Sequence, residues 1–409
     1  MKSSRKFGWW TLGRWALVPV VLVVLFVVLQ FAWGFVVYPA EYVFRVLRWG
    51  QSDAFDWQKF PSHTLAAPSQ TIDWEVAEDP AVPATFADLA GVDDWDAFLG
   101  SNQTQAFLVI RDGEIVYQRY FNGTQPDSIV TSFSVAKSFT SALVGIAISE
   151  GLIGSVNDRV TDYLPELTER DRRFSDITIQ DLLRMSSGLE YEENRILLLS
   201  GDDPLTTYFP DQRWLALNNT HILEPAGLHF SYNKYHPQLL GMILERTTGM
   251  TVTEYVQTRL WTPMGMAYDG SWSTDSVESD FEKMETGVNA RAVDFAKFGQ
   301  LYLNGGEWQG QQLVPQSWVA DSTQPWQAGR PDYYPALFAD GPGDGYYGYM
   351  WWGFQRSGGY DFSAAGDRGQ YIYVSPSSSL VIIRNGTDYG IPYSEWWRLF
   401  YEFATSMQG

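Results

Sequence analysis

The sequence has no cysteine and is poor in histidine and lysine, and each shortage excludes a kind of site. Among its 409 residues there are four histidines and seven lysines. Without cysteine the chain has no disulfide, no thiolate metal site and no cysteine nucleophile. The histidines show no metal-ligand spacing and HExxH is absent, so we expect no metal centre. A net charge of −20 argues against a nucleic-acid partner.

The sequence does have enough apolar residues for a large core. It is 45% hydrophobic and 16% aromatic, and its length suits one large domain or two smaller ones. Two β-rich runs joined at Asp112-Gly113 predict a hairpin. Residues 151–300 are mostly helix and loop, and strand patterns return before an amphipathic helix closes the chain. Strands at both ends around a helical middle predict an α+β fold with an inserted helical lobe.

An apolar run near the N-terminus is long enough to cross a membrane. Residues 15–38 would span roughly 35 Å as a helix. Residues 1–14 carry four basic side chains and no acidic one. The positive-inside rule therefore makes 1–14 a cytoplasmic tail and 15–38 a transmembrane anchor, with the remainder outside the cytoplasm. The alternative is a cleaved signal peptide with a poor cleavage site at Ala32 and Gly34, but signal-peptide apolar regions are shorter, about 7–15 residues.

The rest of the chain divides into a connecting segment and a main domain. Residues 39–85 are predicted to be a juxtamembrane segment and linker, because they are rich in Pro, Ser, Asp and Ala without clear periodicity. Residues 86–409 then form the main α+β domain. We expect the membrane to be a partner through the N-terminal helix alone.

A serine and a lysine three residues apart open a very apolar segment. Ser134 and Lys137 begin the stretch SVAKSFTSALVGIAI, which predicts a buried helix ending near Gly151. The spacing places both side chains on one face. The helix start and the apolar setting favour a neutral lysine, which can accept the proton of the serine hydroxyl. The alternative is a helix-capping serine beside a lysine that extends to solvent.

The same spacing occurs twice more, so context has to decide between the pairs. Ser3 and Lys6 lie in the predicted cytoplasmic tail, and Ser231 and Lys234 lie in the middle of the chain. The pair in the tail is accidental, and only Ser134 combines a helix start with further motifs in order along the chain, so we favour the pair at 134–137.

Several motifs in order resemble those of one enzyme superfamily. SVAK, then DLLRMSSGL, FSYNKYHPQLLG and GDRGQYIYV resemble the ordered motifs of serine β-lactamases and penicillin-binding proteins. The chain is most similar to the branch of β-lactamase-related serine hydrolases that includes class C-type lactamases, esterases and 6-aminohexanoate-dimer hydrolases. The similarity runs over residues 100–405. It implies a β-lactamase-like fold, with an antiparallel sheet flanked by helices and a mostly helical lobe.

The resemblance also implies roles for three residues. Ser134 would be the acylated nucleophile, Lys137 its base, and Tyr232 the group that relays a proton to the leaving group. Tyr232 lies nine residues before Gly241, as the second motif of the family requires. That motif is tyrosine-x-asparagine, and Lys234 stands where the asparagine belongs. We expect the charge of Lys234 to lower the pKa of the Tyr232 phenol. The alternative for Tyr232 is an ordinary core position.

The third motif of the family is lysine-threonine-glycine on a strand facing the serine. Here it aligns with the stretch DRG at 367–369, followed by Gln370. Gly369 would allow the substrate backbone to approach that strand closely. By the same resemblance, the backbone amides of Ser134 and Gln370 would form the oxyanion hole.

The charge of this third motif bears on the substrate. Asp367 occupies the lysine position, which puts lactamase activity in doubt because lactam drugs carry a carboxylate. Arg368 and Lys234 are the cationic candidates for recovering that contact. Small neutral or cationic esters, amides or peptides are the favoured substrates.

Other catalytic patterns fit less well. No serine sits in a GxSxG elbow, and the GxGxxG match at 343–348 leads into an aromatic run rather than a helix. His236 lies next to a proline at a predicted helix start, where a structural role is expected. The sequence therefore predicts a membrane-anchored, extracytoplasmic serine hydrolase that needs no cofactor. The alternative is a penicillin-binding-type sensor or peptidoglycan-binding protein without turnover.

Overall fold

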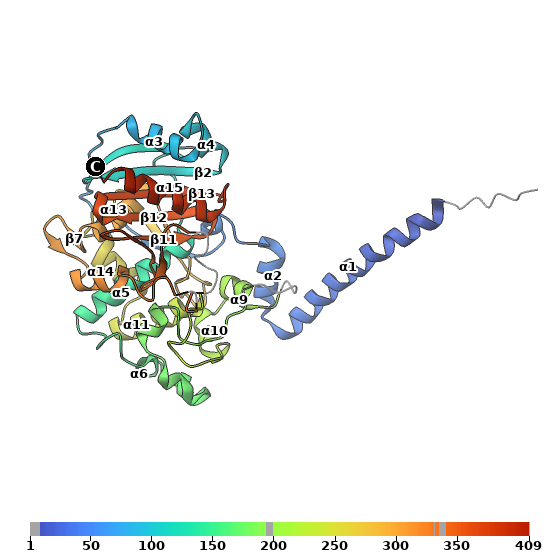
Figure 1. Cartoon of the computed structure of the whole chain (residues 1–409). Helices are drawn as coiled ribbons and strands as arrows, with labels where there is room; N and C mark the ends of the chain where they lie inside the picture. Colours follow the sequence, from blue (N-terminus) through green and yellow to red (C-terminus); the bar gives the residue numbers. More distant parts are fainter. Residues whose placement is uncertain (1–8, 194–198, 331, 335–340, 409) are drawn as a thin grey trace, which may run out of the picture. The chain divides into compact units, whose positions relative to one another are not determined.

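The structure is a computed structural model that describes residues 9–193, 199–330, 332–334 and 341–408 (Figure 1). The chain divides into two compact units. Unit 1 contains Met1–Ser52 and Glu192–Pro210, and unit 2 contains Asp53–Tyr191 and Asp211–Gly409. The predicted linker thus contributes most of its length to unit 2, while part of the predicted main domain belongs to unit 1.

Unit 1 joins the apolar N-terminal helix to a short insert from later in the chain. Its helices are α1 (Trp9–Val37), α2 (Ala40–Trp49) and α9 (Asp202–Tyr208). Within α1, Val18–Val37 has a mean hydropathy of 2.8 and is the one candidate membrane span among the described residues. The Tyr42 hydroxyl donates to the Leu199 carbonyl at 3.1 Å, and Arg45 Nη1 donates to the Tyr208 carbonyl at 3.1 Å. These bonds hold α2 against the insert.

The main sheet of unit 2 has seven antiparallel strands in the order β3-β2-β13-β12-β11-β10-β9. Their bounds are β2 (Thr104–Arg111), β3 (Glu114–Tyr120), β9 (Gly345–Tyr347), β10 (Trp352–Arg356), β11 (Gly359–Gly366), β12 (Gln370–Ser375) and β13 (Leu380–Gly386). Asp112 and Gly113 join β2 to β3 with φ of 53° and 85°, the positive angles that a two-residue hairpin turn requires. The predicted hairpin is confirmed.

Helices cover both faces of this sheet (Figure 1). One face packs against α3 (Ala81–Ala90), α4 (Trp95–Ser101) and α15 (Tyr393–Ser406). This layer is aromatic, with Phe86 stacked on Phe403 at a centroid distance of 4.0 Å. The other face packs against α13 (Ala292–Leu303), where a Cβ on Gly299 would lie 2.6 Å from a methyl of Val381.

Unit 2 also contains two smaller sheets among its described residues. Four strands pair in the order β1-β5-β6-β4, and two more form the hairpin β7-β8. Their bounds are β1 (Ser62–Leu65), β4 (Val130–Thr131), β5 (Gly270–Ser273), β6 (Val288–Ala290), β7 (Glu307–Trp308) and β8 (Gln311–Gln312). Because β1 pairs with β5, the predicted linker is bound into unit 2. Strand β4 leads directly into the turn that carries Ser134.

The helical lobe lies between β4 and the later strands, as the sequence predicted. Its longest helices are α5 and α11, which pack against each other. The bounds of the helices of the lobe and of the one that follows it are α5 (Ala136–Ser149), α6 (Val160–Tyr163), α7 (Glu166–Arg170), α8 (Ile179–Leu183), α10 (Gln212–Asn218), α11 (Tyr235–Thr248), α12 (Val252–Val256) and α14 (Gln316–Thr323). An antiparallel sheet flanked by helices, with a helical lobe inserted, is a β-lactamase-like α+β fold.

Candidate active site

Ser134 sits in a tight turn just before α5. The preceding residue, Phe133, is buried and has φ of 44°, a left-handed conformation that is costly for a bulky side chain. Such strain costs on the order of 1–3 kcal/mol and persists only where the surrounding structure enforces it. A short 3-10 turn (Phe133–Val135) then passes directly into α5. The hydroxyl of Ser134 is thereby fixed at the start of a buried helix.

Lys137 is buried against this hydroxyl. The residue is 1% exposed. Its Nζ donates to Ser134 Oγ at 2.9 Å and to the Glu285 carbonyl at 2.9 Å. A lysine that extends to solvent is therefore excluded. The capping alternative also fails, because the Ser132 hydroxyl donates to carbonyls and neither turn residue caps the helix.

The Tyr232 ring lies close to the same lysine. Lys137 Nζ is 5.0 Å from the centroid of the Tyr232 ring. The ring stacks on Trp352 of β10 at 5.5 Å and meets Tyr347 of β9 edge-on at 6.1 Å. Burial, with a smaller contribution from Tyr232, raises the pKa of Tyr347 well above its usual value. The aromatic run before and within β10 thus forms a wall that holds the Tyr232 ring near Lys137.

The backbone directly after Tyr232 is anchored by Asn233, a residue that the sequence did not single out. Asn233 is fully buried, its Nδ2 donates to the Leu189 carbonyl at 3.3 Å, and its Oδ1 accepts from the Tyr235 N–H at 2.8 Å. Lys234 is half-buried and immediately precedes α11. Its effect on the phenol stays a prediction. The sequence signal for Asn233 is an asparagine directly after the tyrosine, rather than two residues later as in the family motif.

The strand that faces Ser134 is β11, and it ends at Gly366. A Cβ on Gly366 would lie 2.4 Å from the Ser132 carbonyl oxygen and 3.0 Å from the backbone nitrogen of Ser134. Residues 367–369, predicted from the sequence to lie on this strand, do not belong to it, so that prediction is wrong. They form the turn between β11 and β12, with Arg368 at φ of 57°. The stretch DRG matches the lysine-threonine-glycine motif in length and in its final glycine, and this similarity explains the incorrect prediction.

The remaining predicted site residues surround this turn. The Gly369 carbonyl accepts from Arg384 Nη1 at 2.7 Å, and Arg368 Nη1 lies 3.5 Å from Asp388 Oδ2. Gln370 opens β12, pairs across the hairpin with Gly366, and is buried, with Nε2 donating to the Gly386 carbonyl at 2.6 Å. The close approach to Ser134 is therefore made by Gly366, while Gly369 ends the turn and Gln370 lies on the neighbouring strand β12.

A serine–histidine pair also lies in the lobe, but it lacks the features of a nucleophile and base. Ser187 Oγ is 2.6 Å from His236 Nε2, and both residues are buried. The other ring nitrogen of His236 faces the sulfur of Met185 at 3.1 Å rather than a carboxylate. Burial and the nearby Lys137 lower the pKa of His236 to about 3, so the imidazole is neutral and a poor proton acceptor. Its predicted structural role fits these contacts.

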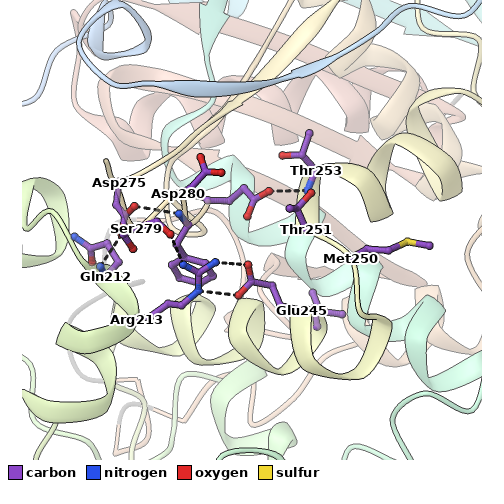
Figure 2. Close-up of polar contacts among 12 residues, drawn as sticks. Gln212, Arg213, Glu245, Met250, Thr251, Thr253, Asp275, Ser279 and Asp280 are labelled. Carbon is purple, nitrogen blue, oxygen red and sulfur yellow. Dashed lines mark hydrogen bonds and ion pairs between the residues drawn. The ribbon is translucent and has the colours of Figure 1, made fainter. Parts of the chain in front are cut away.

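A polar cluster outside the site supports the loop that leads to Glu285 (Figure 2). Arg213 Nε donates to Glu245 Oε2 at 2.9 Å, and Asp275 Oδ2 accepts from the Gln212 N–H at 2.7 Å. Neither these acids nor any other carboxylates and histidines form a group suited to a metal ion within the described part of the chain. The cluster is a structural support for residues 275–282.

A buried lysine on the hydroxyl of a helix-start serine, beside a tyrosine and the end of a strand of an antiparallel sheet, defines a serine hydrolase. The model of the Beta-lactamase family matches residues 100–388, and the chain belongs to that family. Within the β-lactamase and penicillin-binding-protein superfamily it is a β-lactamase-related serine hydrolase.

Individual relatives agree with this assignment. The chain is 25% identical over 362 residues to a 6-aminohexanoate-dimer hydrolase of Paenarthrobacter ureafaciens, covering 82% of this chain and 88% of that protein. A Bacillus anthracis structure assigned to the same activity is 26% identical, covers 88% of this chain and 93% of that one, and has a TM-score of 0.73. A class C β-lactamase in complex with cefoxitin shares the fold, with a TM-score of 0.59, 16% identity, and coverage of 80% and 99%.

Proposed function

We propose that this chain hydrolyses small esters or amides through an acyl-enzyme on Ser134. The observation that carries the proposal is the 2.9 Å contact between Lys137 Nζ and Ser134 Oγ, made by a lysine that is 1% exposed. Burial disfavours the charged form of a lysine, so Lys137 is suited to take the proton of the hydroxyl.

The reaction then follows from the order of these groups. Ser134 Oγ attacks the substrate carbonyl carbon while its proton passes to neutral Lys137. The carbon–oxygen or carbon–nitrogen bond of the substrate breaks, and the leaving group takes a proton relayed through Tyr232. In the second half, water attacks the acyl carbon and the bond from that carbon to Ser134 Oγ breaks. The proton of the water passes through Lys137 and Tyr232 to Ser134 Oγ, and the acid and free Ser134 are released.

The developing oxyanion needs two hydrogen-bond donors close to the nucleophile. We propose the backbone N–H groups of Ser134 and Asp367, in place of the Gln370 amide favoured from the sequence. Asp367 directly follows Gly366, whose backbone lies against the Ser134 nitrogen, whereas Gln370 is one strand further away. The substrate carbonyl would then lie along the end of β11.

Two observations bear on the substrate. The Paenarthrobacter ureafaciens relative is named for hydrolysis of an amide-linked dimer, which favours an amide here. The exposed Asp367 and Asp388 bracket Arg368, and the carboxyl of Asp388 already lies 3.5 Å from its guanidinium. An anionic substrate would meet these carboxylates, so neutral or cationic esters, amides or peptides are favoured.

The test compares two serines that share the same spacing to a lysine. Full-length protein in detergent is treated with a fluorophosphonate probe, and the labelled peptide is located by mass spectrometry. Ser134→Ala is expected to abolish labelling, and Ser231→Ala, the matched control, to retain it. Labelling that survives in Ser134→Ala and disappears in Ser231→Ala would refute the assignment. Release of acid from a p-nitrophenyl ester over many turnovers separates a hydrolase from a sensor that stays acylated.

We further propose that α1 is an uncleaved anchor, with residues 1–14 in the cytoplasm and unit 2 outside. Its support is the apolar Val18–Val37 segment, which is longer than the apolar region of a signal peptide, and the basic tail before it. A C-terminal alkaline phosphatase fusion is expected to be active in cells. An inactive phosphatase together with a fluorescent cytoplasmic reporter at the same position would reverse the orientation.

A further inference from the structure

Helix α2, which follows the apolar span directly, has an apolar face that the rest of unit 1 does not cover. Pro39 disfavours a helical conformation at Tyr38, so α1 ends before it and α2 begins just after it. The buried residues of α2 are Tyr42, Val43, Arg45 and Val46. Phe44 and Leu47 lie three residues apart on its other face and are 60% and 48% exposed. Large apolar side chains gathered on an exposed surface mark a contact with another molecule or with lipid.

This face is continuous with the apolar surface of α1. The Phe44 ring meets the Phe35 ring edge-on, with 5.2 Å between the centroids. Phe35 belongs to the Val18–Val37 span and is itself exposed. A bilayer that surrounds the span would therefore also meet Phe44.

The polar and aromatic groups near this face suit the headgroup layer of a bilayer. Glu41 is paired with Arg45 at 2.5 Å, whereas no described residue forms a hydrogen bond or an ion pair with the exposed guanidinium of Arg48. That guanidinium is thus available for a lipid phosphate. Trp33 and Tyr38, whose rings meet edge-on at 5.7 Å, lie at the end of the span. Tryptophan and tyrosine are enriched where a membrane meets water.

The insert 192–210 reaches the same level of the span. Gly34 lies three residues before the end of the span, which is about 5 Å along the helix. A Cβ on Gly34 would clash with Cδ1 of Leu199, so the insert packs there only because the side chain is missing. The Tyr42 hydroxyl of α2 donates to the carbonyl of the same leucine. Both α2 and the insert therefore lie near the end of the span, and interfacial helices bury their apolar face about 5–10 Å into the headgroup and acyl boundary.

We propose that α2 is an interfacial helix, with Phe44 and Leu47 in the boundary between headgroups and acyl chains of the leaflet in which α1 ends. The inference rests on the proposed anchor and adds a second contact with the bilayer. Because α2 also binds backbone carbonyls of the insert, it holds residues 192–210 at the bilayer surface.

The test uses the absence of native cysteine, which allows one probe to be placed at a time. Phe44→Cys and Leu47→Cys are labelled with the environment-sensitive fluorophore NBD in the full-length protein. Each is reconstituted in phosphatidylcholine–phosphatidylglycerol vesicles whose acyl chains carry bromine either just below the headgroup or near the chain end. We expect blue-shifted emission at both positions and stronger quenching by the shallow bromines. The matched control is Val28→Cys, in the middle of the span, which the deep bromines should quench more strongly.

The outcomes separate the inference from the anchor on which it rests. Emission at 44 and 47 as in water, with deep quenching retained at 28, would overturn the inference and leave the anchor intact. No quenching at 28 refutes the anchor itself, and the inference falls with it.

Two other results would also overturn the inference. Blue-shifted emission at 44 and 47 without quenching by either lipid would show that protein, such as a second copy of the chain, covers this face. Stronger quenching by the deep bromines would show that α2 belongs to the span. Fluorophosphonate labelling of Ser134 checks the folding of each variant, and if one labelled variant does not fold, the other decides alone.

Discussion

Replacing Gly366 by alanine should separate the β11 strand from the nucleophile. The new Cβ would lie 2.4 Å from the Ser132 carbonyl oxygen and 3.1 Å from the Phe133 Cβ. A relaxed contact between carbon and oxygen is about 3.3 Å or longer, so the strand and the Ser134 turn have to move apart by about 1 Å. Gly366 has φ of −130°, which alanine adopts freely, so the effect is one of space and not of backbone strain.

The magnitude follows from how sensitive acyl transfer is to such a displacement. A misplacement of about 1 Å at a reacting centre can lower the rate by about 10²-fold. We therefore expect kcat/KM for a neutral p-nitrophenyl ester to fall by about 10²-fold in Gly366→Ala. Overpacking costs stability as well, typically about 1–3 kcal/mol, so folding at the assay temperature is checked by circular dichroism.

The control is on the same strand. Gly359 begins β11 and is exposed, and a Cβ there meets nothing within 4 Å. Gly359→Ala is expected to keep the wild-type rate. A Gly366→Ala protein that is folded and within about threefold of the wild-type kcat/KM would show that the approach of β11 to Ser134 is not required for acylation.

Three further outcomes are expected. The hydrogen bond that the His63 imidazole donates to Glu282 raises the pKa of His63 to about 9. This contact therefore stabilises the fold most below the unfolded pKa of about 6.5, and the stabilisation is lost as pH rises through 9. The difference in Tm between wild type and His63→Gln should shrink from about pH 6 to about pH 10, and a constant difference would contradict the charge assignment. Lys234→Asn should move the alkaline limb of the pH–rate profile upward if the lysine stabilises the tyrosinate form of Tyr232. An unchanged profile with an unchanged rate would show that Lys234 does not act on the Tyr232 phenol. Nitrocefin should be hydrolysed more slowly than the neutral ester because its carboxylate meets the acidic turn at Asp367, and faster nitrocefin turnover that is lost in Arg368→Ala would reverse that expectation.

The parts of the fold with strong local patterns could be predicted from the sequence. The hairpin at Asp112-Gly113 needs residues that tolerate positive φ, and both are present in a dipeptide between β-rich runs. The buried helix after Ser134 has an unbroken apolar pattern, and α5 follows it closely. In each case neighbouring residues carry the information, so no knowledge of tertiary contacts is needed.

Strand β11 could not be predicted in this way. Its sequence, GYDFSAAG, is rich in glycine, alanine and serine, which have low strand propensity, and lacks a clear alternation. The segment is extended because β10 and β12 pair with it on both sides. The sequence alone therefore favours residues 367–369 for the family motif, whereas the close approach to Ser134 is made by Gly366 at the end of β11.

The division into units also depends on contacts between distant residues. Strand β1 in the predicted linker is defined by its pairing with β5, more than 200 residues later. The insert 192–210 is recognisable because Tyr42 and Arg45 of α2 bind its backbone carbonyls. Neither segment has a periodic pattern that would mark it in the sequence, since each gains its partners only on folding.

The two serine–lysine pairs of unit 2 show why spacing alone does not define this site. Ser231 and Lys234 have the same separation as Ser134 and Lys137, yet Lys234 is half-buried while Lys137 is 1% exposed. What distinguishes Lys137 is its environment: it is buried, and its Nζ donates to the carbonyl of Glu285, 148 residues away. The proposed role as a base rests on this environment, because burial disfavours the charged form of a lysine. No motif in the sequence marks Glu285, because a backbone carbonyl can come from any residue. The apolar helix behind Ser134 predicts the burial, and the fold alone supplies the partner that burial requires.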